Sequence, residues 1–146
     1  MRGKVIAVCR GKKKGKPKED VGSGFFEENF GLVGDAHAGT KKQVSILDQE
    51  IVKELSRQTG LSFPPGAFAE NLLIAGIDSK LLTPGKILKI GRVLLKVEMI
   101  GKEANLVHSY NYKGYSLLPR HGIFARVIQS GLIKNGDQIE LLNHSP

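Results

Sequence analysis

A hairpin signal over residues 86–100 constrains the fold of this sequence more than any other feature. Two aliphatic-rich runs, 86–90 and 93–100, flank Gly91-Arg92, and glycine in the first position suits a type II′ turn. In the second run, apolar side chains alternate with Lys96 and Glu98, so one face is buried and the other faces water. The sequence therefore predicts antiparallel strands that each present one face to a core.

The remaining pattern also favours short strands joined by turns. The chain has 18 glycines and 6 prolines in 146 residues, a composition of many turns and a length that suits one domain. Residues 10–34 show no sustained period, which predicts a long loop. We therefore expect a single, mainly β domain over residues 1–146. Further short, β-branched apolar runs predict strands at 4–9, 43–47, 71–74 and 137–142.

Two short helices are expected. Asp48 can cap the first, in which three aliphatic residues share one face until Gly60 ends the helix. The second is predicted over 124–128, where three apolar residues have helical spacing.

The net charge of +8 is concentrated in one segment. Arg10 and five lysines up to Lys18 contribute six positive charges without one acid, so the rest of the chain carries only +2. The run Lys12–Lys18, hereafter the lysine loop, can attract polyanions but lacks the interleaved aromatic residues that single-strand binding surfaces use for stacking. We therefore expect a solvated or anion-gating loop and no nucleic-acid partner.

Two features indicate a cytoplasmic protein without a membrane partner. No apolar run approaches the roughly 20 residues that span a bilayer, and the N-terminal residues lead directly into a strand. The lone Cys9 cannot form an internal disulfide, in agreement with a reducing compartment.

Cys9 is a candidate nucleophile near the lysines, although an inert thiol at the end of an apolar strand is the favoured interpretation.

The segment Gly31–Gly39 is the strongest candidate for a working surface. If it is extended, Asp35 and His37 point the same way, and its three glycines allow a ligand or another backbone to approach closely. Three interpretations stay open: a tight turn with a structural Asp–His hydrogen bond, a ligand-binding surface, or a metal site that also draws on His108 or His121.

Two further segments carry candidate polar residues. Glu70 and Asn71 enter a strand among apolar neighbours, where they either satisfy loop backbone or shape a pocket rim. Arg120 and His121 precede the predicted second helix, whose N-terminal amides would form an anion site with Arg120; an exposed cap is the alternative. Three tyrosines at 110–115 either line a cleft or form an aromatic loop.

Taken together, these segments resemble the MOSC domain, the family named for the C-terminal domain of molybdenum cofactor sulfurases. The most specific pieces are Gly-Asp-Ala-His-Ala-Gly at 34–39 and Gly-Ala-Phe-Ala-Glu-Asn at 66–71. The matching segments in chain order are 4–8, 13–18, 31–39, 43–47, 66–71, 76–78, 84–85, 90–91, 100–103, 119–127 and 136–137.

The resemblance implies a closed or partly open β-barrel of the pyruvate-kinase-barrel type, with one or two short helices and a role in molybdenum-cofactor metabolism. Larger relatives bind the pterin cofactor or receive sulfur from a pyridoxal-phosphate cysteine desulfurase. The family pattern places a cysteine after Gly-Lys-Glu, proposed to carry sulfur or bind a molybdenum ion. Here that position is Ala104, and further family cysteines correspond to His108 and Leu117.

The leading hypothesis is therefore a MOSC-type domain that binds a pterin cofactor or related anion, with a cysteine desulfurase or molybdoenzyme as partner. Asp35 and His37 would be the catalytic candidates, acting as an acid and base pair or positioning the ligand. The ligand-binding candidates are Glu70, Asn71, Lys102, Arg120 and Arg126, with His108, His121 and Cys9 as further candidates. The alternative is a non-catalytic basic β-barrel that binds anions or nucleic acid through the lysine loop.

Overall fold

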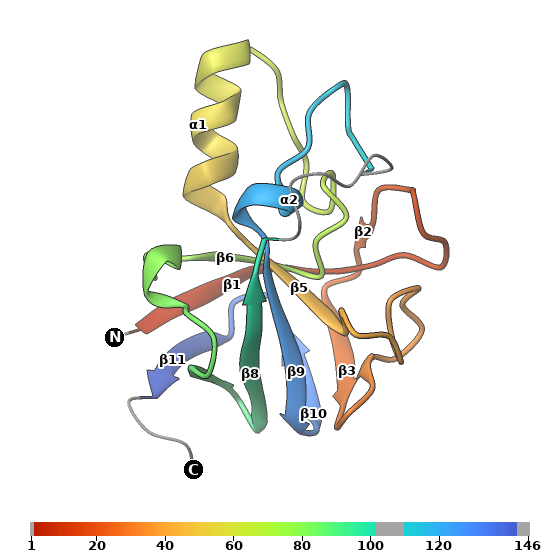
Figure 1. Cartoon of the computed structure of the whole chain (residues 1–146), viewed down its shortest axis with the longest axis vertical. Helices are drawn as coiled ribbons and strands as arrows, with labels where there is room; N and C mark the ends of the chain where they lie inside the picture. Colours follow the sequence, from red (N-terminus) through yellow and green to blue (C-terminus); the bar gives the residue numbers. More distant parts are fainter. Residues whose placement is uncertain (1, 102–109, 143–146) are drawn as a thin grey trace.

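A closed barrel of seven strands forms the body of the molecule (Figure 1). The computed structural model describes residues 2–101 and 110–142. The barrel order is β11-β7-β8-β9-β5-β6-β1, and pairing of β1 with β11 closes it. Its strands are β1 (Arg2–Arg10), β5 (Val44–Asp48), β6 (Leu72–Ala75), β7 (Ile87–Ile90), β8 (Val93–Ile100), β9 (Ile123–Gln129) and β11 (Gln138–Leu142).

All neighbours in the barrel are antiparallel except β5 and β6. The connection between these two parallel strands contains the helix α1 (Gln49–Thr59), which stands at one end of the barrel (Figure 1). The remaining elements are β2 (Glu19–Asp20), which pairs with β1, the 3₁₀ turn η1 (Ser79–Leu81), the one-turn helix α2 (Leu118–His121), and a small sheet of β3 (Ser23–Glu27), β4 (Gly31–Leu32) and β10 (Gly131–Lys134). The expected mainly β barrel is confirmed, and it is closed.

The two clearest local predictions are also confirmed. Ile90 pairs with Val93 across a two-residue turn, in which Gly91 has a φ of +60°. The side chain of Asp48 accepts a hydrogen bond from the backbone N–H of Glu50, and Gly60 ends α1 in the left-handed conformation. Each signal is local, so the sequence determines these elements without knowledge of the rest of the fold.

The predicted helix over 124–128 is wrong, because these residues belong to the strand β9. Ile123, Ala125 and Val127 face the barrel interior, while Phe124 is also buried, on the outer face. The buried Phe124 on the outer face interrupted the alternation of apolar and polar residues that identifies a strand. The predicted loop over 10–34 is also wrong in part, because it contains β2, β3 and β4. In β3, the apolar Phe25 is 46% exposed, so alternating burial along this strand does not appear as alternating apolar and polar residues in the sequence.

Two hydrophobic clusters lie on opposite sides of the barrel wall. The first fills the barrel interior and includes Ile46, Leu88 and Leu95. The second packs the outer face of β1, β5 and β6 against α1 and the segments around Phe68 and Leu117. The second cluster supports one wall of the pocket described below. Within residues 2–101 and 110–142, no helix combines the length and the apolar character needed to cross a bilayer.

Candidate functional site

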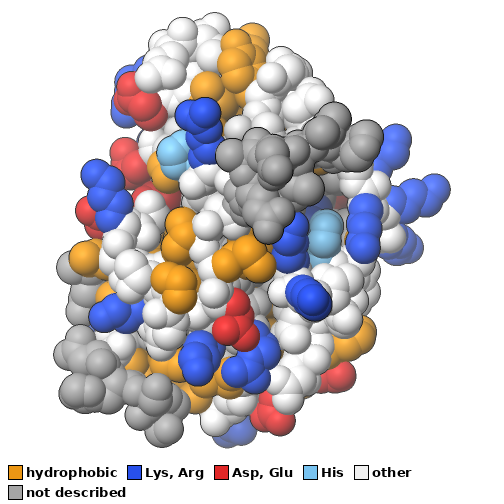
Figure 2. All heavy atoms as spheres, in the orientation of Figure 1, with side chains coloured by type: hydrophobic (Ala, Val, Ile, Leu, Met, Phe, Trp, Pro, Cys, Tyr) orange, Lys and Arg blue, Asp and Glu red, His pale blue; other side chains and the backbone are white. Residues whose placement is uncertain are grey.

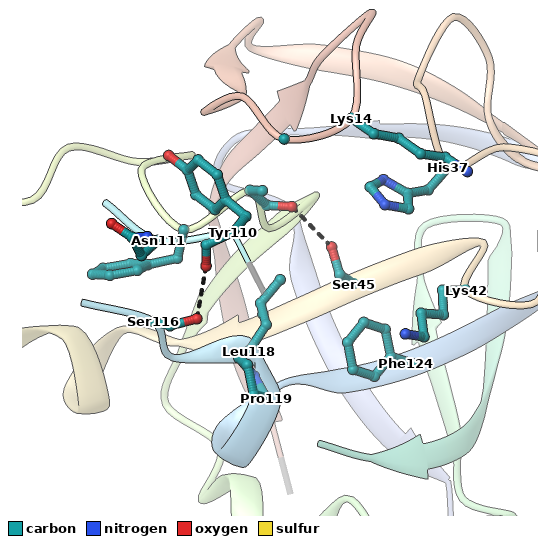
Figure 3. A pocket seen from close by; sticks show the side chains of 13 residues that line it. Lys14, His37, Lys42, Ser45, Tyr110, Asn111, Ser116, Leu118, Pro119 and Phe124 are labelled. Atoms are coloured by element: carbon teal, nitrogen blue, oxygen red, sulfur yellow. Dashed lines mark hydrogen bonds between the residues drawn. The ribbon is translucent and has the colours of Figure 1, made fainter. Parts of the chain in front are cut away.

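A pocket of about 440 Å³ lies against the outer face of β5 and β9 (Figure 3). The lysine loop, the segment before β5, the turn before β6 and the segment before α2 surround it. The described residues that line it are Lys14, Gly15, His37, Lys42, Ser45, Phe68, Ala69, Tyr110, Asn111, Ser116, Leu118, Pro119 and Phe124.

The two sides of this pocket differ in chemistry. Lys14, His37 and Lys42 occupy one side, and none of the described lining residues is a carboxylate. Figure 2 shows lysine and arginine side chains gathered around a histidine over this part of the surface. Aromatic and aliphatic side chains form much of the other side; there, the hydroxyl of Tyr110 donates to the carbonyl of Ala67 at 2.7 Å. The pocket can therefore accept an anionic group on one side and a flat apolar group on the other.

His37 lines the pocket, whereas Asp35 lies beneath it. Residues 35–39 form turns and not the extended strand that the spacing suggested. The Asp35 carboxylate is fully buried; its Oδ2 accepts the backbone N–H of His37 at 3.0 Å. Asp35 Oδ2 and His37 Nδ1 are 3.9 Å apart, too far for a hydrogen bond between the two side chains.

Lys18 lies between this acid and this imidazole. Its Nζ is 2.6 Å from Asp35 Oδ1 and 3.2 Å from His37 Nδ1, and only 2% of its side chain is exposed. The last residue of the lysine loop is thus part of the site's foundation, while Lys12, Lys13 and Lys16 are exposed as expected of a solvated loop.

The surroundings shift the pKa values of both residues. Burial opposes ionisation of Asp35, but hydrogen bonds from Lys18 and from the backbone N–H of Gly11, together with the Lys18 charge, outweigh it and lower the pKa of Asp35. Burial, and then the charge of Lys18, lower the pKa of His37 to about 4. At neutral pH, the site therefore holds a charged Asp35 and an uncharged His37.

Gly66 allows the lysine loop to approach this closely. It has a φ of +85°, and a Cβ there would lie 2.0 Å from the carbonyl oxygen of Lys18. The backbone N–H of Lys18 donates to the carbonyl of Gly66 at 2.9 Å. The segment 66–71 therefore positions Lys18, and through it His37.

Glu70 and Asn71 support backbone and do not line the pocket. Glu70 accepts the N–H groups of Gly66 and Phe68 at 2.8 and 3.1 Å, and burial raises the pKa of its carboxyl group. Asn71 accepts the N–H of Ser45 and donates to the carbonyl of Cys9. These bonds fix the turn that presents Phe68 and the neighbouring Ala69, which has a φ of +66°, to the pocket.

The predicted anion site beside Arg120 rested on a helix that would begin after His121, and no helix begins there. Arg120 and His121 instead end the four-residue helix α2, and β9 follows. Both are exposed; His121 borders a separate groove beside α1. Arg126 points away from the pocket: its Nε is 2.8 Å from Glu98 Oε1 on β8.

The thiol and metal candidates find little support among the described residues. Cys9 is fully buried outside the pocket, and burial, followed by the charge of Glu70, strongly raises the pKa of its thiol. Across residues 2–101 and 110–142, no three histidine, cysteine or acidic side chains are grouped as metal ligands. The candidates Lys102 and His108, together with Ala104, lie outside the described residues.

Several pocket residues were not singled out from the sequence. Ser45 interrupts an apolar strand, a signal that could have marked it, because a polar side chain there must point out of the barrel. Lys42 carried no distinguishing signal, since it follows another lysine in a turn-rich segment. Tyr110 lines the pocket, in agreement with the cleft alternative, whereas Tyr112 and Tyr115 pack edge-on against Phe63.

Solved structures of known proteins share this fold. The YuaD protein from Bacillus subtilis shares the fold with a TM-score of 0.77 at 17% identity, over 99% of this chain and 98% of that one. YiiM from Geobacillus stearothermophilus has a TM-score of 0.74 at 21% identity, over 97% and 75% of the two chains. YiiM from Escherichia coli has a TM-score of 0.69 at 22% identity, over 99% and 71%.

No curated protein matches the sequence. Residues 33–100, which run from the Asp35 turn through β5, β6 and the β7–β8 hairpin, match the family model described as the MOSC domain. Over residues 33–100, the chain is therefore similar to the MOSC domain family.

Proposed function

We propose that this MOSC-like domain binds, without covalent attachment, an anionic ligand that carries a phosphate-type group on a flat ring, such as the pterin of the molybdenum cofactor. One observation carries the proposal: the charged side chains among the described pocket residues, Lys14 and Lys42, are both cations. Because neither competes with a carboxylate in the described lining, both can bind an anion. The volume of about 440 Å³ suits a small molecule.

The opposite wall supports the flat part of such a ligand. Phe68, Tyr110 and Phe124 contribute aromatic surface, and the Nζ of Lys42 lies 5.7 Å from the centroid of the Phe124 ring. A heteroaromatic ring buried against these side chains would gain apolar contact while its anionic substituent reaches the cationic side.

The donor set fits the organic part of the cofactor and not the metal. The described lining offers ammonium, imidazole, hydroxyl and aromatic groups, with no thiol or carboxylate for molybdenum. When bound, the cofactor would supply redox chemistry at its metal, while Lys14 and Lys42 would hold the phosphate. The only cysteine of the chain is Cys9, which is buried, so the proposal includes no sulfur carried on this chain. A molybdoenzyme, or a cysteine desulfurase acting on the bound cofactor, is the proposed partner.

Adjacent lysines provide a matched test. Lys42 lines the pocket and Lys41 does not, so Lys42→Gln and Lys41→Gln remove the same charge at neighbouring positions. Calorimetric titration with a phosphorylated pterin should show affinity about tenfold weaker in Lys42→Gln and little changed in Lys41→Gln. Equal losses in the two variants, or no binding by the unmodified protein, would contradict the proposal.

The exposed lysines favour one second candidate, a basic module for polyanions. Lys12, Lys13 and Lys16 all face solvent outside the pocket. If this is the function, Lys12→Gln/Lys13→Gln should weaken binding to a single-stranded oligonucleotide and reduce its salt dependence. Lys42→Gln should then weaken oligonucleotide binding no more than the loss of any other single surface charge.

A further inference from the structure

The contacts of Lys18 determine which nitrogen of His37 carries the proton. A lysine ammonium has three N–H donors and no acceptor. Lys18 Nζ forms an ion pair at 2.6 Å with a fully buried carboxylate oxygen of Asp35, and it lies 3.2 Å from His37 Nδ1. In that contact Nδ1 must accept, so the proton of the neutral imidazole is on Nε2.

The backbone prevents a simple rearrangement of this contact. Lys18 is held by the hydrogen bond from its N–H to the Gly66 carbonyl, and Asp35 Oδ1 accepts the N–H of Gly11 at 3.0 Å. The second oxygen of Asp35 already accepts the backbone N–H of His37. The main chain of Lys18 and both carboxylate oxygens of Asp35 are therefore held in place beneath the ring.

On that side, His37 faces cations. The ring points towards the centre of the pocket, with Lys14 on one side and Lys42 on the other (Figure 3). The charged groups around the imidazole are thus Lys18 and Asp35 beneath it and Lys14 and Lys42 beside the pocket. Three cations and one acid disfavour a second proton on the ring.

We propose that Lys18 is a positioning residue that holds His37 as the Nε2–H tautomer, so that His37 acts as a hydrogen-bond donor to an anionic oxygen of the ligand. Nε2–H, Lys14 and Lys42 then form one donor set, which selects phosphate-type oxyanions. The ligand class rests on the function proposed above, whereas the tautomer rests on the Lys18 contacts alone.

This assignment changes the role expected of the Asp35 and His37 pair. A general base needs a free lone pair facing the reacting proton, and a metal ligand needs an unprotonated nitrogen facing the metal. The lone pair of His37 faces Lys18 instead, and Asp35 is engaged by Lys18 and two backbone N–H groups. His37 therefore neither accepts a substrate proton nor binds a metal while Lys18 is in place.

The tautomer can be measured on the unmodified protein. Long-range nitrogen–proton correlation spectra of the 15N-histidine-labelled chain at pH 7 distinguish protonated from unprotonated ring nitrogens, and the His37 signals are assigned by their loss in His37→Gln. We expect an unprotonated Nδ1 and a protonated Nε2. A proton on Nδ1 would overturn the proposal, whether or not any ligand binds.

Variants test the positioning role and the ligand class separately. Lys18→Met/Asp35→Asn removes the buried pair without leaving a lone charge, and its His37 should lose the fixed tautomer; retention of the same spectrum would exclude Lys18 as the cause. With inorganic phosphate as probe, His37→Leu should bind about tenfold more weakly, whereas His37→Gln, which keeps an N–H donor, should lose less. Equal losses would exclude the donor role. If phosphate does not bind the unmodified protein, the function proposed above fails while the tautomer result still stands.

Discussion

The barrel interior and the buried polar cluster beneath the pocket are both closed to solvent, but they depend on different forces. The interior is apolar: Ile46, Leu88 and Leu95 are fully buried among similar side chains. The polar cluster comprises the buried residues Lys18, Asp35, Ser45, Glu70 and Asn71. Within the described residues, no buried side-chain nitrogen or oxygen lacks a hydrogen-bond partner. The interior can tolerate repacking, whereas each atom of the polar cluster has a specified partner.

The largest expected effect comes from unpairing the polar cluster. Lys18→Met leaves the Asp35 carboxylate buried without its partner, and we expect the free energy of unfolding to fall by about 3–5 kcal/mol. Lys18→Met/Asp35→Asn should recover much of this loss, because no lone charge remains. Urea unfolding of both variants measures the difference; a double variant no more stable than the single one would contradict the pairing.

Truncating a side chain in the barrel interior should lower the free energy of unfolding without changing the ligand affinity of the pocket. Leu95→Ala removes a fully buried side chain on β8, and we expect the free energy of unfolding to fall by about 3 kcal/mol. Because Leu95 belongs to the interior cluster and does not line the pocket, the folded fraction should bind inorganic phosphate with unchanged affinity. Weaker binding at full folding would show that the two regions are coupled.

Acid should destabilise the folded protein through His37, which contacts Lys18 of the polar cluster, and not through the apolar interior. The pKa of His37 is about 4 in the folded protein and 6.5 when unfolded. Between these values, the unfolded chain binds the extra proton, so stability is lost as pH falls from 6.5 towards 4. Allowing for the 31% exposure of the ring, we expect a loss of about 2 kcal/mol.

The raised pKa of Glu70 acts in the opposite direction above pH 4.5, because there the folded state retains a proton that the unfolded state releases. The measurement is therefore the difference between the unmodified protein and His37→Gln in urea unfolding at several pH values. Parallel pH profiles for the two proteins would show that His37 is not the titrating group.

The smallest effect is expected outside both regions. Arg126 and Glu98 pair on the outer wall with side chains about 40% exposed, so Arg126→Ala should change the free energy of unfolding by less than about 1 kcal/mol. Since Arg126 does not line the pocket, its removal should leave phosphate affinity within about twofold of the unmodified value. A tenfold loss in calorimetry would restore Arg126 as a ligand-binding residue.

The same contrast explains how far the sequence predicts this molecule. Local signals identified the β7–β8 hairpin and the capped helix α1, because one turn or one cap determines each of them. Strand β9 was mistaken for a helix because Phe124, on its outer face, is buried under the pocket together with the residues that face the barrel interior. The burial of β9 depends on where other segments of the chain lie in the fold, and no local pattern in the sequence reports their positions.

The site was predicted less completely, for a related reason. The segment containing Asp35 and His37 was identified, and His37 does line the pocket. Lys18 looked like one more solvated lysine, because its burial depends on Gly66, which is 48 positions further along the chain and allows close backbone approach. Contacts between distant segments leave no period or spacing in the sequence.

The pairing of β1 with β11 that closes the barrel has a consequence for how the chain folds. Arg2, Gly3 and Lys4 pair with residues 138–140, so the seam joins segments separated by most of the sequence. Such non-local pairings slow folding, because the entropy of a long loop must be lost before the contact forms. During synthesis, the edges of β1 and β7 that receive β11 stay unpaired until residues 138–142 emerge. Those two edges are where we expect intermediates of this protein to be most prone to aggregation.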